Sequence, residues 1–131
     1  MEGQVNPPLL LSKTFSLNQA AGNHTLFTAT GDVLIEKLSI YCDAAAAAPL
    51  TDIVIDTTHT TPYVFMTIVE GDILLLAAQA NVAMASQATG VACQLQNGQL
   101  VEVTIGGGAS ASGTLTAVAL WRPLTGAARL T

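Results

Sequence analysis

The stretch VACQLQNGQLVEVTI, residues 91–105, is the part of the chain that decides its fold class. Over residues 101–105, valine and isoleucine alternate with polar residues, which is the two-residue period of a half-buried strand. Asn97-Gly98 separates this strand from the segment 91–96. Asn-Gly is a strong hairpin signal, because both central residues of a type I′ turn need positive φ. The stretch therefore predicts an antiparallel hairpin of strands 91–96 and 99–105.

The rest of the chain repeats this pattern of short β-type segments divided by Gly, Asp, Asn and Pro. No segment shows the clean 3.6-residue period of an amphipathic helix. The predicted strands span residues 13–17, 24–30, 33–42, 51–57, 63–69, 73–78, 91–96, 99–105 and 114–122. About nine strands at roughly 8–12-residue spacing predict an all-β fold: an antiparallel β-sandwich of jelly-roll type, or a barrel.

Local patterns predict further features along the chain. The uninterrupted apolar run 73–78 predicts a central strand, whereas 80–88 fits either a short helix or a weak strand. Pro7-Pro8 excludes helix near the start and predicts an extended N-terminal arm over residues 1–12. We expect a single domain over 13–123 and a C-terminal tail over 124–131.

The composition excludes several classes of protein. Half of the 131 residues are hydrophobic and only 10% are charged, against about 25% charged in an average soluble domain. Disorder requires low hydrophobicity and high net charge, so this chain is expected to fold. Four basic residues against nine acidic ones give a net charge of −5. That balance argues against a nucleic-acid partner, which would call for a basic patch.

Neither export nor a membrane is indicated by the sequence. The N-terminus carries Glu2 and no basic region, unlike a secretory signal. The longest uncharged apolar run, 73–78, is far shorter than the roughly 20 residues of a membrane span. Cys42 and Cys93 are interpreted as two buried thiols, with a disulfide between them left open.

No set of residues has the spacing of a catalytic or metal site. His24 and His59 could serve as bases, but no Gly-x-Ser-x-Gly elbow accompanies them. Asp52 and Asp56 lie about 13 Å apart on one strand face, at about 3.3 Å per residue, which is too far for a carboxylate pair. The glycines of 106–108 lack the Gly-Lys-Ser/Thr of a phosphate loop. We therefore expect no enzyme, no cofactor and no metal.

Two of the predicted strands, 33–42 and 63–69, have apolar residues on both faces. Extra apolar faces are typical of interfaces between subunits. The predicted oligomer-interface residues are Val33, Ile35, Tyr41, Tyr63 and Phe65.

Three further motifs carry a resemblance to a known group of proteins: TGDVLIEKL at 30–38, TTHTTP at 57–62 and LWRPL at 120–124. Over about residues 14–130 the chain resembles small proteins from the structural modules of tailed bacteriophages. Within that group it is most similar in kind to capsid decoration, or cement, proteins.

The resemblance implies a β-rich homotrimer, made in the host cytoplasm, that binds the outer capsid surface of the virion across seams between major capsid protein subunits. Its partners would be copies of itself and the major capsid protein, with no nucleic acid and no membrane. The N-terminal arm is the predicted capsid-contacting strap, through Pro7, Pro8, Leu9, Leu10 and Leu11. Another phage tail, fibre or baseplate module and a small carbohydrate-binding β-sandwich remain the alternatives.

Overall fold

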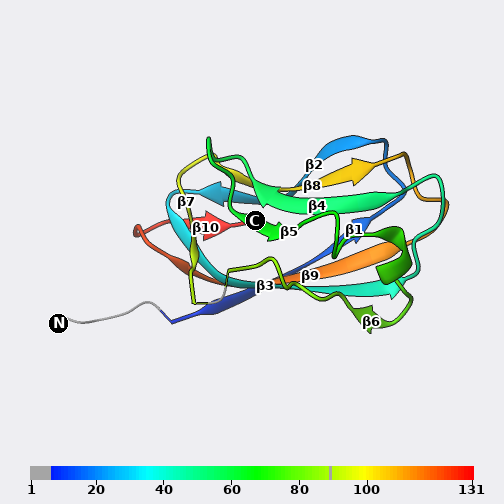
Figure 1. Ribbon diagram of the computed structural model, residues 1–131. Coiled ribbons are helices and arrows are strands. Elements are labelled where there is room, and N and C mark those ends of the chain that lie inside the picture. Colours follow the sequence, from blue (N-terminus) through cyan, green and yellow to red (C-terminus); the bar gives the residue numbers. More distant parts are fainter. Residues whose placement is uncertain (1–6, 89) are drawn as a thin grey trace.

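Short antiparallel strands form almost the whole structure, as the two-residue periods of the sequence predict. The computed structural model describes residues 7–88 and 90–131. Within these residues lie ten strands and one 3₁₀ helix (Figure 1). In chain order they are β1 (Leu9–Ser16), β2 (Gly22–Thr30), β3 (Val33–Ala44), β4 (Asp52–Thr57), β5 (Val64–Met66), η1 (Ile73–Leu75), β6 (Ala80–Asn81), β7 (Cys93–Leu95), β8 (Leu100–Gly106), β9 (Thr114–Pro123) and β10 (Arg129–Leu130).

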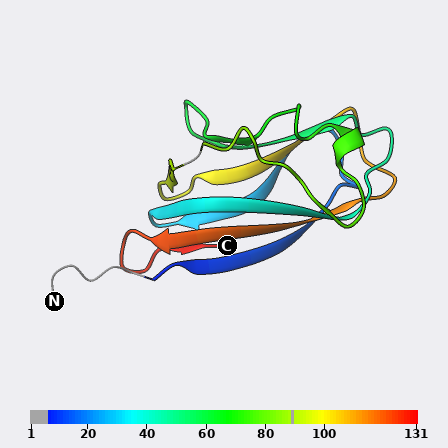
Figure 2. The ribbon, with the colours of Figure 1, turned by 60° about the horizontal axis from the view of Figure 1, so that its bottom comes forward.

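The strands pair as one nested antiparallel ribbon that is rolled into two layers. β4 pairs with β5, β3 with β6 and β7, β2 with β8, and β1 with β9. Rolling places β9 beside β3 and β8 beside β4, which closes a first sheet β1-β9-β3-β6/β7 and a second sheet β10-β2-β8-β4-β5. This is the two-layer arrangement of a jelly roll, and the prediction of an antiparallel sandwich is confirmed. Figure 2 shows β1, in dark blue, at the edge of the first sheet beside β9.

The core lies between the two sheets and consists of the inward residues of alternating strands. β8 alternates between buried and half-buried residues along its whole length, and β9 does so from Thr114 to Arg122. β9 contributes the small side chains of Ala117 and Ala119 together with Leu115 and Trp121, all buried. Phe27 and Phe65 are the largest side chains that are fully covered. Burial of side chains of this size supplies the main driving force for folding, about 1.5–3 kcal/mol for each large one.

A β-bulge in β3 overturns the prediction that this strand has two apolar faces. Ile35 pairs with Trp121 and Lys37 with Leu120, so Glu36 is an extra residue in the strand. The extra residue reverses the alternation. Val33 and Ile35 point into the core before the bulge, and the even-numbered apolar residues do so after it.

The predicted hairpin over 91–105 is wrong, and so is its type I′ turn, because Gly98 has a positive φ but Asn97 does not; the chain nevertheless turns at Asn97-Gly98. Gln99 N donates to Gln96 O at 3.0 Å, and Gly98 has a φ of 87°. However, β7 pairs with β3 in the first sheet, whereas β8 pairs with β2 and β4 in the second. The Asn97-Gly98 turn therefore carries the chain from one layer to the other, so that Leu95 and Val101 enter the core from opposite sheets.

The predicted strands 63–69 and 73–78 are also corrected. β5 covers only three residues of the first, and the second contains the 3₁₀ helix η1 rather than a central strand. The Asp72 carboxylate accepts a hydrogen bond from Leu74 N at 2.9 Å, which caps the helix. Leu76 is buried, but Leu74 and Leu75 point outward. The segment 80–88, left open between helix and strand, contains the two-residue strand β6 followed by a loop.

The folded domain extends beyond the predicted range 13–123 at both ends. β1 begins at Leu9 and pairs with β9 from Trp121 onward, so residues 9–12 are part of the sheet and not of an arm. Residues 1–6 of the predicted arm lie outside the described residues. In the predicted tail, β10 pairs with β2 through Thr30 and Ala29.

Candidate functional site

The predicted capsid contacts lie at the start of the edge strand β1. Pro7 and Pro8 are exposed and precede the strand directly. Leu10 is 73% exposed on the outer side of the sheet, and Leu9 is 43% exposed. Leu11 is half-buried and packs against the core. The five residues therefore form one continuous stretch with large apolar side chains in contact with solvent.

Three of the five predicted oligomer-interface residues are not at the surface. Val33, Ile35 and Phe65 are at most 1% exposed and belong to the core. The prediction that they face a neighbouring subunit is wrong, because it assumed strict alternation through residue 36 and a longer strand around residue 65.

Tyr41 and Tyr63 are half-buried and occupy different surroundings. Tyr63 donates a hydrogen bond to Val91 O at 2.5 Å, and its ring packs on Phe65 at 4.8 Å between ring centroids. Burial, with a smaller effect of nearby Cys93, raises the pKa of Tyr63. Tyr41 lies opposite Thr116 on the outer side of the first sheet.

The outer side of the first sheet carries a row of apolar and hydroxyl side chains. Leu10 is directly opposite Leu120, and Val118 is opposite both Ser12 and Ser39. Tyr41 lies one row further along. These half-buried or exposed residues, Leu10, Tyr41, Val118 and Leu120, are named the sheet-one face.

The two histidines make structural hydrogen bonds. His24 Nε2 lies 2.6 Å from Ala20 O. His59 Nε2 lies 2.8 Å from Gln94 O, and since a carbonyl only accepts, this nitrogen carries the proton. His59 Nδ1 then accepts from the buried Thr57 hydroxyl. His59 thus ties the β4–β5 turn in one sheet to β7 in the other.

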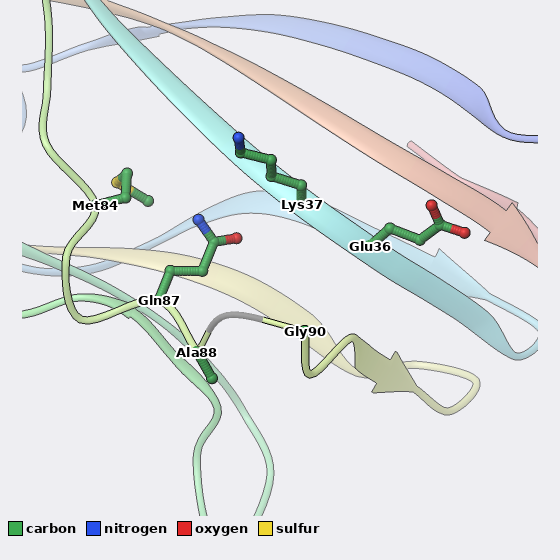
Figure 3. Close-up of a pocket in the computed structure, with 6 residues that line it drawn as sticks. All are labelled: Glu36, Lys37, Met84, Gln87, Ala88 and Gly90. Carbon is green, nitrogen blue, oxygen red and sulfur yellow. The ribbon is translucent and has the colours of Figure 1, made fainter.

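A hollow of about 390 Å³ lies where the outer partner of β3 is interrupted (Figure 3). It is lined by Glu36, Lys37, Met84, Gln87, Ala88 and Gly90. The Gln87 side chain fills the gap between β6 and β7, because its amide accepts from Leu38 N at 2.9 Å and donates to Leu38 O at 3.0 Å. The Glu36 carboxylate forms an ion pair with Arg122. These polar groups of the hollow therefore hold β3 and its neighbours in place.

The thiols of Cys42 and Cys93 are buried and free, which agrees with the first of the two interpretations. Cys93 pairs with Ile35, roughly 20 Å along β3 from Cys42 at about 3.3 Å per residue, so no disulfide joins them. Burial raises the pKa of Cys93 to about 12. Burial and the charge of Asp43 raise the pKa of Cys42. Both thiols are therefore poor nucleophiles.

Acidic residues gather on the outer side of the second sheet. Asp56 lies directly opposite Glu102, and Asp52 forms an isolated bridge with Asp72. These four residues are named the acidic face. Burial raises the pKa of Asp56. In residues 7–88 and 90–131, no three His, Cys, Asp or Glu side chains form a group that could hold a metal ion.

The exposure of segment 67–76, which lies between β5 and β6 and contains η1, does not follow from the sequence pattern. Ile68, Val69, Leu74 and Leu75 are all more than half exposed on it. A pattern reading predicts burial for such a run of large apolar residues. The signal that points the other way is Asp72, a capping residue directly before the leucines.

No helix in the described part of the chain has the length and hydrophobicity of a membrane span. No family model matches the sequence, and a search of curated proteins finds no match. Among solved structures, the protein is similar to a chain in the acidic stable capsid structure of Helicobacter pylori bacteriophage KHP30. The TM-score is 0.55 at 11% sequence identity, over 98% of this chain and 95% of that chain. The comparison shows that the two chains share a fold along nearly their whole lengths.

Proposed function

We propose that the protein is a non-enzymatic structural component of a bacteriophage virion that binds the outer capsid surface as a homotrimer. There it stabilises the shell across seams between major capsid protein subunits. The observation that carries the proposal is the end-to-end likeness to a chain of a phage capsid structure. The sequence motifs at 30–38, 57–62 and 120–124 support the same group of proteins.

The physical character of the molecule suits such a role. A clamp needs a stiff body and adhesive surfaces, and repeated copies on a shell gain affinity through multivalency. The two-layer sandwich supplies the stiff body. We propose the sheet-one face as the contact between copies, because it presents Tyr41, Val118 and Leu120 in adjacent rows. Closed symmetry would cover this surface and prevent open-ended association.

The exposed stretch at the start of β1 is the proposed strap. Pro7, Pro8 and Leu9–Leu11 lie at the edge of the first sheet. At such an edge, a segment of another protein can contact both the side chains and the unpaired backbone groups of the strand. Leu10 belongs both to the proposed strap and to the sheet-one face.

The test is to add the purified protein to capsids that lack it. Light scattering should give a trimer at micromolar concentration, and binding to capsids should saturate at a multiple of three copies per site. Particles carrying the protein should withstand higher temperature before they rupture. A monomer in solution would contradict the trimer, and absence of saturable binding would contradict the capsid role.

A further inference from the structure

The segment 67–76 holds a concentration of exposed apolar surface. Single exposed apolar residues are ordinary on a protein surface, but clusters of them mark interaction sites. Leu74 is 86% exposed and Val69 is 72% exposed, with Ile68 and Leu75 beside them in sequence. These four are half of the large hydrophobic residues that are exposed in residues 7–88 and 90–131.

The segment is held firmly on the second sheet. Ile53 N donates to Gly71 O at 2.9 Å, and Ile73 N donates to Thr51 O at 3.0 Å. A Cβ on Gly71 would overlap the carbonyl oxygen of Ile53, so glycine allows the close approach of the segment to β4.

A buried carboxylate fixes the segment from its other side. Glu70 accepts from the Thr67 hydroxyl at 2.5 Å and from Ser86 N at 2.9 Å. The apolar side chains are thus presented on backbone that is already ordered. Little conformational entropy would be lost on binding, which favours affinity.

The surface next to the segment is acidic. Asp72 lies within the segment, and Asp52, Asp56 and Glu102 continue the acidic face along β4 and β8. Of the four basic residues, Lys13, Lys37 and Arg122 lie on strands of the first sheet, and Arg129 lies on β10, at the edge of the second sheet opposite to β4 and β5. Asp56 directly opposite Glu102 is a destabilising arrangement in an isolated sheet. A basic partner would relieve this repulsion.

The charges also decide which partner fits. A second copy docking through the same surface would bring acid against acid. A second copy docking through Lys37 and Arg122 would have to use the outer side of the first sheet, where Lys37 lies opposite Leu120 of the sheet-one face, and the proposed contact between copies already covers that face. Nucleic acid would be repelled by the four carboxylates. A protein surface of another kind, apolar at its centre and basic at its rim, is complementary in both respects.

We propose that segment 67–76, with the acidic face beside it, is the surface through which the protein docks on an apolar pocket rimmed by Lys and Arg on the major capsid protein. This inference rests on the proposed function and adds to it the side of the molecule that meets the shell. Leu74 and Val69 enter the pocket, and the acidic face pairs with its rim.

The test compares matched variants in binding to capsids that lack the protein. Leu74→Ser and Val69→Ser should each lower affinity about tenfold, the loss typical of a central interface residue. Leu124→Ser and Val91→Ser remove the same side chains from exposed positions outside the segment, and should stay within about twofold of the wild type. All four should remain folded and trimeric, because the replaced side chains lie outside the core.

The contribution of the acidic face to binding is measured separately, through the salt dependence of the affinity. Raising NaCl from about 0.1 M to about 1 M shortens the Debye length from about 10 Å to about 3 Å and should weaken wild-type binding. Asp56→Asn should reduce this salt dependence without lowering thermal stability, whereas Asp43→Asn, on the other sheet, should leave the salt dependence unchanged.

The outcomes separate the two proposals. If wild-type protein binds and the 67–76 variants bind equally well, the docking surface is wrong and the capsid role stands. If the two control variants lose as much affinity as the test variants, or if Leu74→Ser yields a monomer, the docking surface is also wrong, because the effect is then general or belongs to contacts between copies. If wild-type protein does not bind, both proposals fail.

Discussion

Glu70 shows how one residue organises a surface. Its side chain is 6% exposed, and it is the acidic side chain that the described part of the chain buries. Burial alone would raise its pKa, but hydrogen bonds from the Ser86 hydroxyl, the Thr67 hydroxyl and the Ser86 amide outweigh that effect and lower the pKa to about 2. The folded protein therefore stabilises the charged form of Glu70 more than the unfolded chain does.

The depressed pKa of Glu70 predicts a pH-dependent contribution to stability. A carboxyl with a lower pKa in the folded state stabilises the fold above its ordinary pKa of 4.5, and this stabilisation is lost as pH falls through about 2. We expect Glu70→Gln to reduce the free energy of unfolding by about 2 kcal/mol at pH 7, since it removes charged hydrogen bonds. Urea titrations at pH 7 and at several lower values measure the difference. The two proteins should converge towards pH 2, and a constant difference would contradict the assignment.

At the scale of the element, Gly71 explains why segment 67–76 lies where it does. Gly71→Ala would force the new methyl against the Ile53 carbonyl and should destabilise the protein by about 1–3 kcal/mol, the usual cost of overpacking. Gly126→Ala is the matched control, because a Cβ there meets no atom within 4 Å. Thermal denaturation of both variants gives the comparison. Equal melting temperatures would show that the segment is not packed against β4.

The edge strand β1 gives a second element-scale prediction. Removing residues 1–8 leaves every β1–β9 pair in place, so we expect unchanged stability. Removing residues 1–11 also deletes the pairs of Leu9, Leu10 and Leu11 with β9 and exposes part of the core. This longer deletion should lower the free energy of unfolding by about 1–3 kcal/mol, in line with the loss of partly buried leucines. Urea unfolding of both truncated proteins decides whether β1 begins at Leu9.

Comparison of individual elements shows which features a sequence can predict. The strands around Ile53 and Val103 follow from strict alternation, and the structure confirms them. The bulge at Glu36 does not follow, because one inserted residue reverses a period of two without changing the composition. The loss of Val33 and Ile35 from the predicted interface is a consequence of that single residue.

The exposed side chains of segment 67–76 could not be predicted, for a different reason. Hydrophobicity predicts that the run 73–78 is buried, while the direction of its side chains depends on the Asp72 cap and on the contact of Gly71 with Ile53. A short cap competes locally with strand formation, so a periodic pattern alone cannot resolve it. The sequence predicts the position of the turn at 97–98 but not its type, since Asn97 lacks the positive φ of a type I′ turn. Whether that turn joins strands of one sheet or of two depends on partners distant in sequence.

At the scale of the whole molecule, the low charge of the chain goes together with the way its apolar residues are distributed. The core between the two sheets of the nested ribbon takes up most of the large apolar residues. Much of the remaining apolar surface lies at the sheet-one face and segment 67–76, while Leu9, Val91 and Leu124 are exposed outside these two regions. Four of the nine acidic residues lie at the acidic face, whereas Glu36 and Asp43 lie on β3 of the first sheet.

The integrity of this two-layer core can be tested at its centre. Val103 is fully buried between the layers, so Val103→Asp would place an unpaired charge in the core and should destabilise the protein by more than about 3 kcal/mol. Thr104→Lys is the control, because the next residue of β8 points to the outer side, is half-buried and lies near the carboxylates of the acidic face. It should change stability by less than about 1 kcal/mol. Urea unfolding measures both, and a loss below about 1 kcal/mol for Val103→Asp would mean that Val103 does not face the core. A large loss for Val103→Asp alone would show that the face of β8 that carries Val103 is buried, as the two-layer sandwich requires.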